Sequence, residues 1–358
     1  MWPDDRLANL LGIEHPIIQA PMAGASTPEM AAAVANSGCL GSLGCALMSP
    51  EQYQQTFNAT RALTNGALNM NFFCHAEPGD DEDRNKRAVA SLQPFYDELD
   101  LGEMPDAKPV HFPFDMEMAE AVIATNPAVV SFHFGLPDAD IVERLKETGL
   151  TILSSATTAA EARDLAARGC DAIIAQGWEA GGHHGYYLEG NDAAVGTMAL
   201  VPQLVDEVDV PVIAAGGIAD GRGIAASFAL GAAGVQIGTA FLTTRETGIP
   251  PVHQEVLLKS QGSDTATTRA FSGRPARGVI NRYIREMMAE EMNLPDFPIM
   301  NTLSGPLRKT SGAAGSPDFV AMWSGQAVGL NRQSDVTSLV KRLISETEIV
   351  FRKLGNEI

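Results

Sequence analysis

The feature that most constrains this chain is the regular recurrence of short apolar runs separated by stretches with helical spacing. Each run is short enough for one strand, and alanine, leucine and charged residues recur at three- and four-residue intervals between most of them. Clear helical stretches are Pro28–Asn36, Ala139–Thr148, Ala159–Arg168 and Asp220–Leu230. The eight predicted strands are Pro16–Met22, Leu40–Gly44, Leu68–Phe73, Val129–Gly135, Thr151–Ala156, Asp171–Gly177, Pro211–Gly217 and Gly234–Phe241.

Alternating strands and helices favour an α/β fold with a parallel sheet whose faces are covered by helices. Eight such units close more naturally into a (β/α)8 TIM barrel than into an open sheet. The alternative is a doubly wound sheet. It is disfavoured because the first strand does not enter a GxGxxG turn, and Gly38, Gly41 and Gly44 have the wrong spacing and surround the second strand.

Two regions interrupt the alternation and set the expected domain organisation. Residues 1–246 are predicted to form the barrel, with a charged and proline-containing insertion at about 77–116. Residues 247–335 are predicted to form a mostly helical cap or substrate region, and 336–358 an amphipathic helix that packs back on the barrel. A cap on the carboxyl-terminal barrel face would shape the active site, since barrel enzymes use the loops that follow the strands.

Composition narrows the classes of partner. The chain has 358 residues, 45% of them hydrophobic, and a formal net charge of −19. This charge disfavours nucleic acid and anionic membranes as partners through the summed repulsive field. The four cysteines show no CxxC spacing and are expected to be reduced packing residues. Without a signal-like or membrane-length apolar segment at the start, we expect a cytoplasmic protein.

Small and amide residues follow the first and third predicted strands. Ala20, Pro21 and Met22 end the first strand, where a proline and small residues let a flat ligand approach the backbone. Asn69 and Asn71 lie on one side of the third strand at a spacing of two. Asparagine is disfavoured within strands, so these amides either bind a polar heterocycle or tether a loop.

The most informative segment follows the sixth strand and holds two histidines among four glycines. An imidazole at a barrel mouth can remove or hold a proton near neutral pH, and we favour His183 over His184 for this role. Gly181 and Gly182 precede it. A metal site is disfavoured, since no HExxH helix or cysteine–histidine ligand set accompanies the pair. His133, at the end of the fourth strand, is expected to support the site from behind.

The ends of the last two strands resemble a phosphate cradle. Gly216 and Gly217 end the seventh strand, and Gln236, Ile237, Gly238 and Thr239 end the eighth. Barrels often hold a ligand phosphate on the loops after these two strands through backbone N–H groups. A single phosphate site without the dinucleotide motif points to FMN rather than NAD.

Five basic residues in the cap region are candidates for steering an anionic substrate towards the site. Most basic side chains on a surface are simply solvated, so they are left out of the predicted site. They are Arg274, Arg277, Arg282, Arg308 and Lys309.

Together these segments resemble the nitronate monooxygenase family, formerly called 2-nitropropane dioxygenases, and specifically its first class. The match spans nearly the whole chain, and the segments occur in the family's order. They are Pro16–Gly24, Asn71–Phe73, Gln176–Gly185, Val212–Ile218, Gln236–Thr239, Phe271–Gly278 and Asn301–Leu303. The resemblance implies FMN contacts from Ala20, Pro21, Met22, Asn71, Gln176, Gly181, Gly182, Gly216, Gly217 and Gln236–Thr239, with His183 as the catalytic histidine.

The implied activity is oxidation of an alkyl nitronate, such as propionate 3-nitronate, by FMN and O2 to an aldehyde or ketone plus nitrite, a detoxification. His183 would either deprotonate a neutral nitroalkane or, when protonated, hold the nitronate anion. The alternatives are an FMN-dependent enoyl-acyl-carrier-protein reductase, an NADH:quinone reductase of the same superfamily, and a non-catalytic FMN-binding barrel. The physiological nitronate and the choice between monomer and homodimer stay open.

Overall fold

The computed structural model describes residues 2–79, 81–188 and 193–355. Its centre is a barrel of eight parallel strands, and each of the eight predicted runs contains one of them, so the predicted barrel is confirmed. A parallel bridge between Ile18 and Leu40 brings the first strand to the second and closes the ring. In spatial order the strands are β1 (Ile17–Gln19), β9 (Gly234–Ile237), β8 (Val212–Ala215), β6 (Ala172–Gln176), β5 (Thr151–Ala156), β4 (Val129–His133), β3 (Leu68–Phe73) and β2 (Gly41–Gly44).

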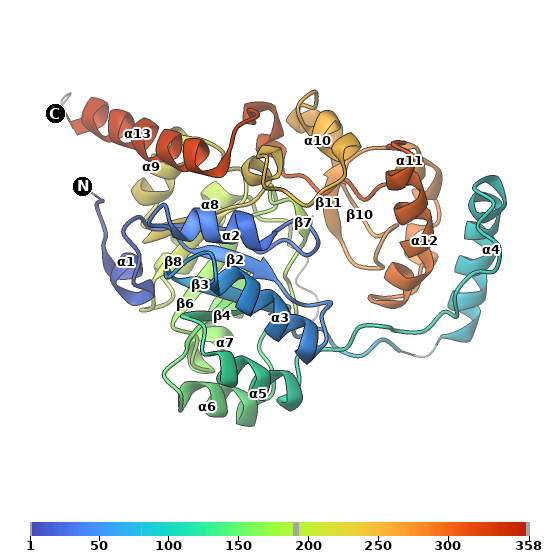
Figure 1. Ribbon diagram of the computed structural model, residues 1–358, viewed down its shortest axis with the longest axis horizontal. Helices are drawn as coiled ribbons and strands as arrows, with labels where there is room; N and C mark the ends of the chain where they lie inside the picture. Colours follow the sequence, from blue (N-terminus) through green and yellow to red (C-terminus); the bar gives the residue numbers. More distant parts are fainter. Residues whose placement is uncertain (1, 80, 189–192, 356–358) are drawn as a thin grey trace.

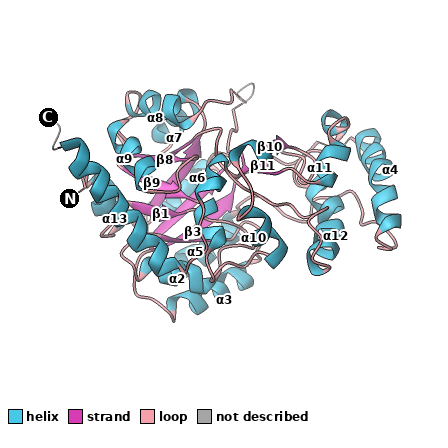
Figure 2. Cartoon of the chain, turned by 90° about the horizontal axis from the view of Figure 1, so that it is seen from above, coloured by secondary structure: helices cyan, strands magenta, loops and turns pink. Residues whose placement is uncertain are grey.

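An outer layer of helices surrounds the strands (Figures 1 and 2). Several start at a side chain that accepts a hydrogen bond from the first turn, as Thr27, Ser49 and Asp220 do, which satisfies N–H groups that lack a partner within the helix. The helices are α1 (Arg6–Leu11), α2 (Pro28–Ala35), α3 (Pro50–Arg61), α5 (Met116–Thr125), α6 (Ala139–Lys146), α7 (Ala159–Ala167), α8 (Thr197–Val205), α9 (Gly221–Ala229) and α13 (Val336–Gly355).

Two apolar clusters stabilise this barrel. One lies inside it, where strand residues such as Ile18, Leu153 and Ile213 pack with Leu7 and Leu11 of α1. The other lies between the strands and the outer helices. The inner packing closes the amino-terminal end and leaves the carboxyl-terminal end for a site.

The last helix packs against the outer layer of the barrel. Helix α13 runs along α9 and α2, and Val336, Leu339, Val340 and Leu343 join the outer cluster. Residues 356–358 of the predicted terminal segment lie outside the described residues.

A second body packs beside the carboxyl-terminal barrel face and forms the cap. It contains helices α10 (Pro251–Leu257), α11 (Arg282–Met287) and α12 (Ile299–Ala313), and a small sheet ordered β10 (Thr265–Thr268), β11 (Ala276–Val279) and β7 (Gly182–His183). The sheet was not foreseen by the mostly helical expectation. It was missed because its strands, with the sequences TATT, ARGV and GH, contain no apolar run of the kind that marks the barrel strands.

Helix α4 (Glu82–Glu98), from the predicted insertion, also lies in the cap. Its Leu92 and Tyr96 pack with Met300 and Leu303 of α12, and the Tyr96 hydroxyl donates to the Leu303 carbonyl oxygen at 2.7 Å. Figure 1 shows α4, α11 and α12 on the same side of the barrel, with long loops leading to α4. Residues distant in sequence therefore build the cap. Among the described residues, no helix has both the length and the apolar character needed to span a membrane.

Candidate active site

A cavity of about 560 Å³ lies between the carboxyl ends of the barrel strands and the cap, within the size range of ligand sites. Its barrel wall comes from residues that follow β1, β3, β6, β8 and β9. Its cap wall includes Phe297, Trp323 and the α12 residues Asn301, Gly305 and Arg308. The cavity thus combines both bodies of the molecule.

Almost all of the predicted site residues line this cavity. They are Ala20, Pro21, Met22, Asn71, His133, Gln176, Gly181, Gly182, His183, Gly216, Gly217, Gln236, Gly238 and Thr239. Two do not. Ile237 is buried in the outer cluster, and Asn69 donates from Nδ2 to Ser42 Oγ at 3.1 Å beneath the cavity.

The floor at the ends of β8 and β9 suits a ligand that binds close to the backbone. Gly216 and Gly217 have φ values of 104° and 72°, a region that favours glycine. A side chain at Gly181 would also be excluded, because its Cβ would lie 2.5 Å from the Gly325 nitrogen. Nearby, the buried Gln236 Oε1 has no hydrogen-bond partner among the described residues. An unpaired acceptor beside glycine backbone fits a polar heterocycle carrying N–H donors.

His183 lies on β7, so the cap sheet fixes its backbone through pairing with Ala276 on β11. Its Nε2 lies 2.9 Å from Ser272 Oγ, and that hydroxyl donates to the Arg274 carbonyl oxygen at 3.1 Å. Because the one hydroxyl hydrogen is used there, Oγ accepts from His183 Nε2–H. The neutral ring therefore carries its proton on Nε2, and Nδ1 has a free lone pair.

Two barrel side chains hold the loop that carries His183. Gln176 donates from Nε2 to the His183 carbonyl oxygen at 3.0 Å and accepts from Gly185 N at 2.7 Å. His133 Nε2 lies 3.0 Å from the same carbonyl oxygen, and His133 Nδ1 lies 2.6 Å from Ser155 Oγ. A carbonyl oxygen only accepts, so His133 Nε2 donates. Both side chains therefore position His183.

Burial makes these imidazoles neutral. Loss of solvent, reinforced by the nearby His133, Arg274 and Arg308, lowers the pKa of His183 to about 3. Burial likewise lowers the pKa of His133 to about 4. At neutral pH, His183 therefore supplies a lone pair and not a charge.

His184 points elsewhere. Its ring stacks on Trp178 with 4.2 Å between ring centroids, and burial lowers its pKa to about 3. It does not line the cavity. Adjacent residues on an extended segment face opposite sides, which is why only one of the pair reaches the site.

The five basic residues that were left out of the predicted site divide into two groups. Arg308 and Lys309 line the cavity. Arg274, Arg277 and Arg282 do not: Arg274 lies 3.9 Å from the centre of the Phe134 ring, and Arg282 pairs with Glu98 at 2.6 Å. A cation inside the cavity was missed because sequence spacing alone does not say which face of α12 meets the barrel.

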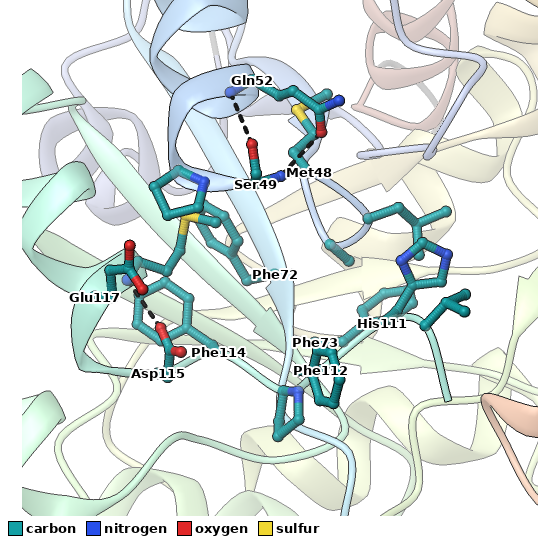
Figure 3. Close-up of a pocket in the computed structure, with 16 residues that line it drawn as sticks. Met48, Ser49, Gln52, Phe72, Phe73, His111, Phe112, Phe114, Asp115 and Glu117 are labelled. Atoms are coloured by element: carbon teal, nitrogen blue, oxygen red, sulfur yellow. Dashed lines mark hydrogen bonds between the residues drawn. The ribbon is translucent and has the colours of Figure 1, made fainter. Parts of the chain in front are cut away.

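A second cavity of about 370 Å³ opens at the rim, between the loop after β2 and the segment before α5 (Figure 3). Phe72, Phe112 and Phe114 lie on its wall, and Leu47 and Phe73 belong to both cavities. We treat the larger of these two cavities as the site, because His183 and the glycine floor line it and do not line the rim cavity.

Comparison with known proteins identifies the family of this chain. The model of the nitronate monooxygenase family matches residues 4–346. The chain belongs to this family. A probable nitronate monooxygenase from Staphylococcus aureus is 40% identical over 354 residues, covering 98% of this chain and 99% of that relative. The protein is therefore an oxidoreductase of the nitronate monooxygenase family.

Solved structures agree. A nitroalkane oxidase from Streptomyces ansochromogenes superimposes with a TM-score of 0.89 at 36% identity, covering 98% of this chain and 99% of that one. FabK from Thermotoga maritima gives a TM-score of 0.77 at 30% identity, covering 99% of both chains. Both solved structures therefore share the fold of this chain over nearly its whole length.

Proposed function

We propose that the protein is an FMN-dependent nitronate monooxygenase that oxidises small alkyl nitronates with O2 to an aldehyde or ketone plus nitrite. The observation that carries this proposal is the pairing of a neutral His183 with the cationic Arg308 in one cavity above a glycine floor. The family and the similarity to a nitroalkane oxidase support the same class of substrate.

FMN is the proposed cofactor, and the residues present fit it. Gly216, Gly217, Gly238 and Thr239 would hold its phosphate, and the unpaired Gln236 Oε1 would accept from its ring system. When bound, FMN supplies the capacity to oxidise an electron-rich, carbanion-like anion and to pass electrons to O2.

His183 is proposed to manage one proton. Its Nδ1 lone pair would accept the proton on the carbon beside a nitro group, while Nε2–H remains bonded to Ser272. The nitronate formed in this way is an anion, and an anion beside the ring raises the pKa of the imidazolium and stabilises the pair. Neutral nitroalkanes would therefore need deprotonation by His183 before oxidation, whereas pre-formed nitronates would not need this step.

The substitution His183→Asn tests this assignment. Turnover of neutral nitroethane should fall by about 10²- to 10⁴-fold, the usual contribution of a general base, and turnover of pre-formed ethyl nitronate should fall much less. Steady-state oxygen consumption with each substrate measures both. If both activities stay at the level of the unmodified protein, the role given to His183 is wrong.

An anaerobic experiment separates the proposed activity from its alternatives. Ethyl nitronate should bleach the flavin absorbance of the purified protein, and NADH should not. Rapid bleaching by NADH alone would instead favour an enoyl reductase or quinone reductase. A yellow protein that neither compound reduces would be a non-catalytic flavin-binding barrel, and a colourless preparation would contradict the cofactor assignment.

A further inference from the structure

Arg308 lines the cavity and, unlike Arg269 and Arg282 of the cap, has no carboxylate partner among the described residues. Arg269 meets Asp296 at 3.1 Å, and Arg282 meets Glu98 and Glu286 at 2.6 and 2.7 Å. Within the described residues, no acidic side chain lies at salt-bridge distance from Arg308. The side chain is partly buried, and it lies on the face of α12 that lines the cavity.

Its hydrogen bonds are also incomplete. Nη2 donates to the carbonyl oxygen and to Oδ1 of Asn301, at 2.9 and 2.8 Å. The buried Nε has no hydrogen-bond partner within the part of the chain that the structure describes. A partly buried cation with an unused donor is costly unless a counter-ion joins it, and the described residues provide none. This arrangement calls for an anion supplied from the cavity.

The charge acts at the right place. It helps to lower the pKa of His183, so the guanidinium lies within electrostatic range of the reacting imidazole. It also lowers the pKa of His111, on the wall of the rim cavity. The floor around Gly216 and Gly217 belongs to the barrel and not to α12, so the two anion-binding features come from different bodies of the molecule.

We propose that Arg308 binds a planar two-oxygen anion of the substrate, and thereby selects anionic substrates in a protein with a net charge of −19. A nitronate group, a carboxylate and the product nitrite all present two oxygens in one plane, which a guanidinium matches with parallel N–H donors. The inference rests on the proposed function only for the choice of nitronate as the reacting anion.

Binding of simple anions tests the inference without turnover. Nitrite and acetate are titrated into the purified flavoprotein, and the dissociation constants are read from the change in flavin absorbance. In Arg308→Met both constants should rise by about 10- to 100-fold, the range expected for a hydrogen bond to a charged group. Arg308→Lys keeps the charge without the planar fork and should fall between the two.

The matched control is Arg332→Met, which removes one positive charge from an exposed residue outside the cavity. Flavin content and melting temperature are measured for every variant. If Arg308→Met does not fold, Arg308→Gln removes the charge while keeping a donor for Asn301, and its acetate constant decides the question. Dissociation constants within twofold of the unmodified protein would overturn the inference.

Turnover then distinguishes which end of the substrate Arg308 binds. If it binds the nitronate, kcat/KM for ethyl nitronate falls in Arg308→Met. If it binds a remote carboxylate, only propionate 3-nitronate is affected. Arg308-dependent acetate binding in a protein that oxidises neither nitronate would contradict the proposed function and uphold this inference, whereas normal turnover with unchanged anion binding would do the reverse.

Discussion

At the scale of single residues, His183 and Arg308 show how unequal the sequence signals were. The position of His183 at the barrel mouth was predictable, because glycines on both sides mark an exposed loop after a strand. The position of Arg308 in the cavity was not predictable, because a basic residue in an unassigned segment is usually solvated. The roles of Gln176 and His133 in holding the loop were also beyond the sequence, since they depend on which carbonyl oxygen their side chains reach.

Acid stability provides a test at the same scale. The unfolded chain protonates His184 below a pKa of about 6.5, whereas the folded protein keeps it neutral down to about pH 3. The unfolded state therefore binds more protons between these values, and stability falls as the pH is lowered through this window. At pH 5, this one histidine should cost about 2 kcal/mol of folding free energy.

The substitution His184→Phe should remove that cost, since the ring still stacks on Trp178 and the buried Nε2 has no hydrogen-bond partner among the described residues. The drop in the free energy of unfolding between pH 7 and pH 5 should be smaller in the variant by about 2 kcal/mol. Urea denaturation at both pH values measures it. An equal drop in both proteins would mean that His184 is accessible to protons in the folded state.

At the scale of elements, the eight barrel strands were predictable because each is an apolar run bounded by turn residues. The cap was not. Helix α12 carries Gly305, Pro306 and Gly312, residues that disfavour helix, so its sequence gives no clear helical signal. Tertiary packing against α4 outweighs this local preference. A contact between segments about two hundred residues apart cannot be predicted from a local sequence pattern.

The packing of α4 can be tested with Leu92→Ala. Leu92 is fully buried between α4 and the cap helices, so its truncation should lower the free energy of unfolding by about 2–5 kcal/mol. Leu354→Ala, at an exposed residue of α13, is the matched control and should change it by less than about 0.5 kcal/mol. Urea denaturation compares them. Equal, small effects would show that α4 is not part of the cap core.

At the scale of the whole molecule, neither body holds a complete site. The barrel supplies the glycine floor and the side chains that hold the His183 loop, and the cap supplies Ser272, Arg308 and the strand that pairs with β7. The expected boundary near residues 246–247 therefore runs through one functional unit. We propose it as a boundary of packing and not of activity.

The contrast between an acidic exterior and a cation in the cavity has a kinetic consequence. With a net charge of −19, the protein's outer field slows the approach of a nitronate, while the attraction of Arg308 is confined to short range. Added salt shortens the range of the outer repulsion, to about 8 Å at 0.15 M, and screens the enclosed charge much less.

For anionic substrates, kcat/KM should therefore rise as sodium chloride increases from about 10 to 150 mM, when substrate capture limits the rate. For neutral nitroethane it should stay nearly constant. Stopped-flow measurement of flavin reduction at several salt concentrations checks both, and a fall in kcat/KM for ethyl nitronate would mean that attraction extends beyond the cavity mouth. The protein should therefore capture its anionic substrate faster at about 150 mM sodium chloride than at about 10 mM.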